Sequence, residues 1–91
     1  MLDVTERAKQ ELKRILSSKV DHPLAALRLI STNAGEFGLS IDIEAEGDQV
    51  VEHAGSKVLL VEDRLATRLE GVTFDVEDTP EGPNLVLFKE S

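Results

Sequence analysis

Apolar and polar residues follow two different periods along this chain. Near the N-terminus, apolar residues recur every three or four positions, which is typical of one face of an α-helix. The spacing predicts a helix from Thr5 to about Ser18. Its inward stripe consists of Val4, Ala8, Leu12, Ile15 and Leu16. Thr5 or Asp3 is placed to cap the first free amides of this helix.

After residue 23 the pattern changes to strict alternation, which is typical of strands with one buried face. Strands are predicted over residues 24–32, 39–45, 49–54, 57–61, 72–77 and 85–88. In the clearest of them, the residues expected to face inward are Leu39, Ile41, Ile43 and Ala45. Residues 58–61 are apolar without alternation, so this strand is expected to be covered on both faces.

A short second helix is predicted over residues 62–70, with Asp63 as its cap and Gly71 at its end. The order is therefore a helix, about four strands, a short helix and two strands, without a βαβ rhythm. This order predicts one α+β domain over residues 1–91, with a mixed or largely antiparallel sheet curled into a sandwich or partial barrel.

Composition limits the chemistry available to the chain. Its 91 residues include no Trp, Tyr or Cys, so the core must be mainly aliphatic. The absence of cysteine excludes disulfides, thiolate nucleophiles and sites in which thiolates hold zinc or iron–sulfur clusters. The net charge of −8 argues against unassisted binding to nucleic acids or anionic membranes and favours a basic protein partner. With no signal peptide or membrane-spanning run recognised, we expect a cytoplasmic protein.

The candidate functional loop is Gly35-Glu36-Phe37-Gly38, which lies between two predicted strands. Two glycines three positions apart predict positive φ angles or a close backbone approach. Glu36 is either a ligand for a divalent ion, together with His53 or surface carboxylates, or a solvated carboxylate. Phe37 is either an exposed contact anchor or a side chain folded back onto the core. The solvated reading of Glu36 is favoured because hard cations usually require several oxygen ligands.

Other polar residues have simpler structural explanations. The acidic run from Asp42 to Asp48 departs from the spacing of a calcium loop and fits the solvent-facing side of a strand. His22 and His53 are interpreted as surface histidines. Arg28 is expected on the second face of its sheet, paired with a nearby carboxylate. No hydroxyl–histidine arrangement or acid–base pair predicts an enzyme, so we expect no catalytic residues.

Several short stretches, taken in order, resemble the HesB-like domain of the A-type iron–sulfur carrier family, the IscA type of protein. They are the helix opening at residues 4–8, Leu27-Arg28-Leu29 followed by the loop at residues 35–38, the strand at 57–61, Gly71 with the strand after it, and residues 86–88. The resemblance covers most of the chain. It implies the HesB-like fold, and the family's dimers and tetramers make self-association an expectation.

The departures from that family concern its metal ligands. In the family, a loop cysteine and a C-terminal Cys-x-Cys pair hold iron or a cluster. Glu36 stands at the position of the loop cysteine, and the chain reaches Lys89-Glu90-Ser91 without a cysteine pair. A carboxylate is a hard ligand and does not replace thiolate in a cluster. We therefore expect a module without cofactor that has lost cluster ligation and acts through protein contacts; the alternative is a divalent metal-binding module using Glu36.

Overall fold

The computed structural model describes residues 2–19, 21–32 and 36–89. In chain order, its elements are β1 (Asp3–Val4), α1 (Glu6–Lys19), β2 (Ala25–Ser31), β3 (Phe37–Ile43), β4 (Asp48–His53), β5 (Ser56–Glu62), α2 (Asp63–Arg68), β6 (Val72–Thr79) and β7 (Gly82–Lys89). The predicted α+β class is confirmed, and the predicted strands are all present. The two-residue strand β1 was not predicted.

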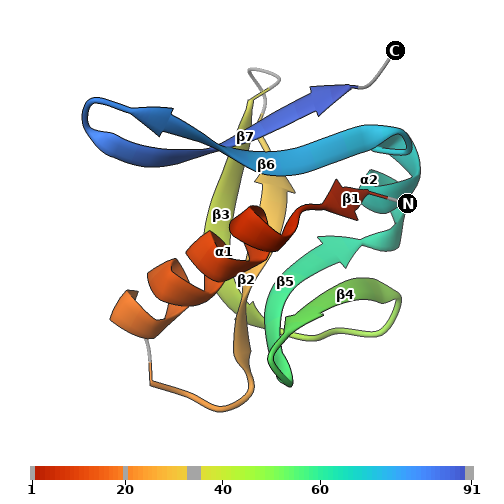
Figure 1. The fold of residues 1–91 in the computed structure, drawn as a ribbon. Coiled ribbons are helices and arrows are strands. Elements are labelled where there is room, and N and C mark those ends of the chain that lie inside the picture. Colours follow the sequence, from red (N-terminus) through yellow and green to blue (C-terminus); the bar gives the residue numbers. More distant parts are fainter. Residues whose placement is uncertain (1, 20, 33–35, 90–91) are drawn as a thin grey trace.

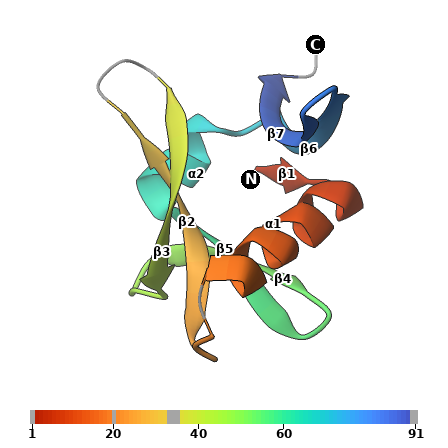
Figure 2. The same ribbon diagram turned by 90° about the vertical axis from the view of Figure 1, so that its left-hand side faces the viewer.

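The strands form two separate sheets (Figure 1). One has the order β1-β6-β7, and the other has the order β3-β2-β5-β4. The β2–β3, β4–β5 and β6–β7 pairs are antiparallel, whereas β1–β6 and β2–β5 are parallel. Both sheets are therefore mixed, as predicted, and they do not close into a barrel. Seen from the side, α1 and the β6–β7 hairpin lie on the same side of the β2–β3 pair (Figure 2).

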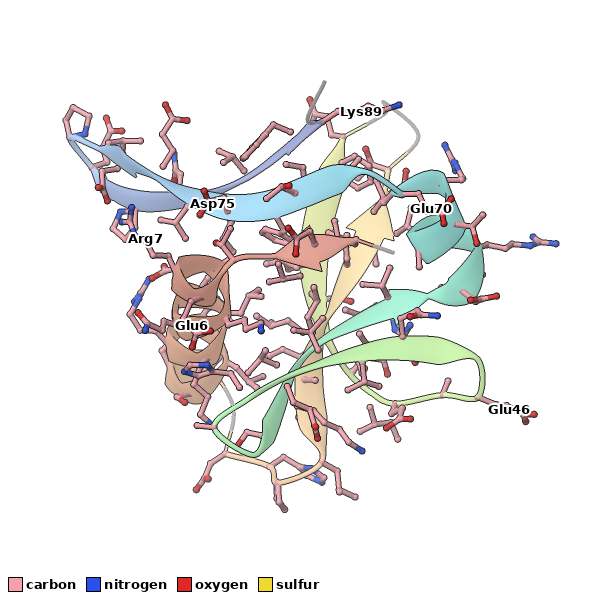
Figure 3. The ribbon with its side chains drawn as sticks, turned by 45° about the vertical axis from the view of Figure 1, so that its right-hand side comes forward. Glu6, Arg7, Glu46, Glu70, Asp75 and Lys89 are labelled. Carbon is pink, nitrogen blue, oxygen red and sulfur yellow. The ribbon has the colours of Figure 1, made fainter. Side chains whose placement is uncertain are left out.

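The start of α1 is attached to the three-stranded sheet through Thr5. The Ala8 amide donates a hydrogen bond to Thr5 Oγ1 at 3.2 Å, and the Thr5 hydroxyl donates to Asp75 Oδ1 at 2.6 Å. Thr5, and not Asp3, is therefore the residue that caps the helix. The hydroxyl bond to Asp75 lowers the pKa of that carboxyl. In Figure 3, Asp75 and Arg7 lie close to this junction between α1 and β6.

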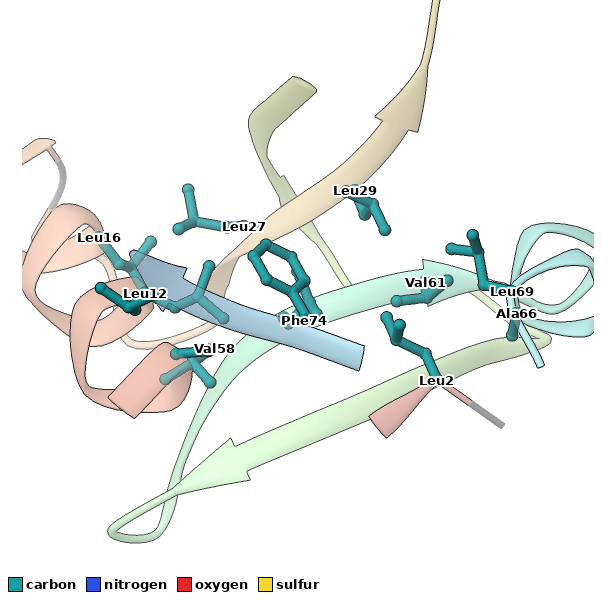
Figure 4. Packing of buried hydrophobic residues seen from close by; sticks show 13 residues of the cluster. Leu2, Leu12, Leu16, Leu27, Leu29, Val58, Val61, Ala66, Leu69 and Phe74 are labelled. Atoms are coloured by element: carbon teal, nitrogen blue, oxygen red, sulfur yellow. The ribbon is translucent and has the colours of Figure 1, made fainter. Parts of the chain in front are cut away.

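The core lies where α1 meets both sheets, and it is mainly aliphatic, as the composition requires (Figure 4). Ala8, Leu12 and Leu16 from the predicted helical stripe are buried, and Ile15 packs against them half-buried. Residues 58–61 of β5 are at most 1% exposed, which confirms that this strand is covered on both faces. Phe74 is the one aromatic side chain in the buried cluster.

Several local expectations are wrong, among them the inward position of Ala45, which lies beyond β3 and is exposed. Asp63 is the first residue of α2, and the cap position is held by Glu62 without a side-chain capping bond. A carboxylate in the first helical turn still favours the positive end of the helix dipole. Ile41 and Ile43 do share a face with Leu27 and Ala25, but they are 44% and 56% exposed. The alternating pattern therefore assigned Ile41 and Ile43 to the correct face of the sheet. No other element packs over that face at this edge, so both side chains remain exposed.

The described residues contain no helix that is long and apolar enough to cross a membrane.

Candidate functional site

An apolar groove, which we call the inter-sheet groove, lies between the start of β3 and the hairpin strand β7. Its volume is about 450 Å³, within the range of ligand pockets. The lining residues are Leu29, Glu36, Phe37, Gly38, Leu39, Phe74, Leu85 and Leu87. The described part of the candidate loop therefore lines the groove. Leu85 and Leu87 of β7 line it as well, and no sequence motif predicts that they lie close to the loop.

Glu36 is the one charged side chain among the groove residues, and it is exposed. Its backbone is held by two hydrogen bonds across the base of the loop. The Thr32 amide donates to the Glu36 carbonyl at 2.8 Å, and the Glu36 amide donates to Thr32 Oγ1 at 3.3 Å. The groove therefore combines apolar walls with a single carboxylate at its rim.

Phe37 and Gly38 belong to strand β3 instead of the loop. Phe37 is 42% exposed and lies outside the buried cluster, so it does not fold back onto the core. A Cβ added to Gly38 would meet Ile30 Cγ1 at 3.5 Å, an ordinary contact, and the φ angle of Gly38 is not positive. The special backbone predicted for Gly38 is therefore absent. Gly35 lies outside the described residues.

The geometry does not support Glu36 and His53 as joint metal ligands. Phe37, which follows Glu36, is paired with Ser31 at the end of β2, whereas His53 is paired with Ser56 at the start of β5. Because β2 and β5 run parallel, these positions lie at opposite ends of the four-stranded sheet. His53 Nδ1 is instead 3.3 Å from Glu6 Oε1. Among the described residues, no group of three or more metal-ligating side chains is found.

The groove residues also do not fit an iron–sulfur cluster. A cluster requires several thiolate or imidazole ligands at fixed positions. The sequence has no cysteine, and the residues that line the groove provide one carboxylate and no imidazole. The donor set of the groove is therefore unsuitable for holding a cluster.

The acidic run from Asp42 at the end of β3 to Asp48 at the start of β4 has a structural role. Arg28 Nε donates to Asp42 Oδ2 at 2.7 Å, and Arg28 Nη1 and Nη2 donate to the Asp48 carboxylate at 2.8 and 2.6 Å. Asp48, whose side chain is 3% exposed, also accepts the Ala45 amide at 2.7 Å. The hydrogen bonds from Arg28 lower the pKa of both carboxyls. The predicted pairing of Arg28 with a carboxylate on the second sheet face is confirmed.

No family model matches the chain. It is 36% identical over 87 residues to an uncharacterised protein from the nifU 5′ region of Azotobacter vinelandii, covering 90% of this chain and 79% of that protein. It is 33% identical over 91 residues to an uncharacterised protein from the nifU 5′ region of Cereibacter sphaeroides, covering 94% of this chain and 84% of that protein.

Two solved structures share the fold. Escherichia coli SufA, described as involved in the biosynthesis of iron–sulfur clusters, matches with a TM-score of 0.70 and 19% identity, covering 97% of this chain and 84% of SufA. IscA with a [2Fe–2S] cluster matches with a TM-score of 0.57 and 15% identity, covering 98% of this chain and 85% of IscA. The predicted HesB-like fold is therefore confirmed. The identities to the Azotobacter and Cereibacter proteins show that the chain belongs to the same family as these two uncharacterised proteins.

Proposed function

We propose that this protein is a non-catalytic accessory protein of iron–sulfur cluster assembly that acts through protein contacts and does not ligate a cluster with its own side chains. The observation that carries the proposal is the inter-sheet groove, which has apolar walls and a single carboxylate. The genetic region of its relatives and the described role of SufA support the pathway. As part of the same proposal, the protein works in the cytoplasm and does not bind nucleic acid.

The groove has the chemistry of a protein contact. Phe37 stands at its rim with 42% of its surface exposed, and Leu85 and Leu87 form a half-buried wall. Aromatic side chains beside an apolar hollow are common anchors of protein interfaces. The net charge of −8 favours a partner whose contact surface is basic, because opposite charges speed association. Acidic proteins are disfavoured as partners because like charges repel.

The nifU product is the first partner to test, because the relatives come from the nifU 5′ region. We expect purified Azotobacter NifU to bind the protein in a calorimetric titration. Phe37→Asp should weaken this binding at least tenfold, about 1.4 kcal/mol, because it places a charge in the apolar contact. The matched control is Phe88→Asp, since Phe88 is 44% exposed but lies on the other sheet, outside the groove residues. Absence of binding, or equal effects of the two substitutions, would contradict the proposal.

A further inference from the structure

Strand β3 carries a row of four apolar side chains, three of which the rest of the fold leaves exposed. We call this row the β3 strip; it consists of Phe37, Leu39, Ile41 and Ile43. The register places them opposite Ser31, Leu29, Leu27 and Ala25 of β2, so they lie on the face of the sheet that holds the core. Leu39 packs against the core, whereas Phe37, Ile41 and Ile43 are 42%, 44% and 56% exposed. The strip extends the apolar groove along the whole length of β3.

β3 is also an open edge. Among the described residues it is paired only with β2, so its other side presents unpaired backbone groups. Proteins usually protect such edges with bulges, proline or lysine. The opposite edge of the same sheet, β4, has a register irregularity between Val51 and Glu52 and contacts α1. β3 has no proline or lysine, its pairing with β2 is regular, and its one charged side chain, Asp42, is paired with Arg28 of β2.

The charge of the chain favours a segment of another protein over a second copy on this edge. Each copy carries a net charge of −8, and like charges repel, so a second copy approaching β3 is disfavoured.

Two hollows accompany the strip at its ends. The inter-sheet groove lies at the Phe37 end, and a second hollow of about 260 Å³ lies at the other end. The second hollow is lined by His22, Ala25, Ile41, Asp42 and Ile43. Because alternate residues of a strand point to the same face, an added strand places its inward side chains over both hollows.

The charges around β3 indicate which residues the added strand would carry. Two carboxylates on or next to β3 are paired within the chain, Asp42 with Arg28 and Glu44 with Lys57 at 2.7 Å. In the described structure, Glu36 next to the strip is an exposed carboxylate for which no ion pair is found, and the chain as a whole carries a net charge of −8. A segment with lysine or arginine is therefore complementary to this surface, and an acidic segment is not.

We propose that β3 binds an extended segment of a partner protein as a fifth strand of the sheet, with apolar residues facing the β3 strip and basic residues at the intervening positions. Pairing along seven residues forms roughly six to eight backbone hydrogen bonds, because alternate facing residues exchange two bonds each. This inference rests on the proposed function and specifies how the partner is held.

The probe is a fluorescein-labelled nine-residue peptide of alternating lysine and valine, titrated against the full chain by fluorescence anisotropy. We expect saturable binding that Ile41→Asp weakens at least tenfold and Phe88→Asp leaves within twofold. Two further peptides have the same sequence with N-methyl groups on alternate residues. In one peptide the odd-numbered residues are methylated, and in the other the even-numbered residues are. Because N-methylation removes amide donors from one strand edge, one methylated peptide should lose binding and the other should retain it.

Each other outcome overturns the inference. Absence of binding excludes the added strand, and binding that both methylated peptides and Ile41→Asp retain reflects charge attraction alone. A dimer in sedimentation that Ile41→Asp dissociates, without peptide binding, shows a second copy on this edge. If NifU still binds Ile41→Asp as tightly as the wild-type protein, while Phe37→Asp weakens it, the added strand is wrong and the proposed function stands. If NifU binds neither the wild-type protein nor any variant, the proposed function itself fails.

Discussion

Phe74→Ala is expected to lower the free energy of unfolding by roughly 4 kcal/mol, because it removes a ring from the closed core and leaves a cavity. Phe74 is 3% exposed and belongs to the cluster that joins β6 to α1 and to the four-stranded sheet (Figure 4). Urea unfolding followed by circular dichroism measures the loss. The substitution also removes part of the floor of the inter-sheet groove.

Phe88→Ala is the matched control, since Phe88 lies on the neighbouring strand β7 and is 44% exposed. It should cost less than about 1 kcal/mol, as surface substitutions usually do. Equal losses for the two phenylalanines would show that Phe74 does not join the two sheets in the way described.

Arg28→Met should be the second strongly destabilising change, at roughly 2–4 kcal/mol, because it leaves the buried Asp48 carboxylate without its cation. The side chains of Arg28 and Asp48 are 16% and 3% exposed. Methionine keeps most of the length of the side chain, so the loss reports the charge and the hydrogen bonds. Arg7→Met is the control, because the Arg7–Asp78 pair is exposed and such pairs contribute below about 1 kcal/mol.

The cost of Arg28→Met should depend on pH. Arg28 lowers the pKa of Asp48 and Asp42 in the folded protein below their usual value of 3.8. The ionised carboxylates therefore stabilise the fold above pH 4, and this contribution is lost as the pH falls below 4. The difference in unfolding free energy between wild type and Arg28→Met should shrink over that range. A difference that stays constant from pH 7 to pH 2.5 would contradict the assigned ion pairs.

The periodicity of apolar residues correctly predicted the elements whose pattern is contained within one short stretch of sequence. The helical spacing of Ala8, Leu12 and Leu16 placed α1 and its buried face correctly. The unbroken apolar run at residues 58–61 correctly indicated a strand covered on both faces. The strand β1 was missed because two residues are too few to show alternation.

The candidate site depended on contacts that periodicity does not contain. The loop sequence directed attention to Glu36 and Phe37, and the structure places both at a groove. Leu85 and Leu87 were recognisable as strand residues, but nothing in the pattern placed them opposite Phe37, because that contact depends on how the two sheets pack. Likewise, alternation assigned Ile41 and Ile43 to the core-facing side but could not show that the cover ends before it reaches them.

The central claim is that the protein acts through protein contacts and does not ligate an iron–sulfur cluster with its own side chains. This claim is tested most directly by the iron and sulfide content of the protein. The chain is expressed with added iron, isolated without oxygen and analysed together with its visible absorption spectrum. IscA, whose structure holds a [2Fe–2S] cluster, is prepared in parallel as the positive control. We expect a folded, colourless protein with substoichiometric iron beside a coloured IscA. Stoichiometric iron and sulfide with cluster absorption would contradict the account, because the ligands would then have to be groups other than cysteine.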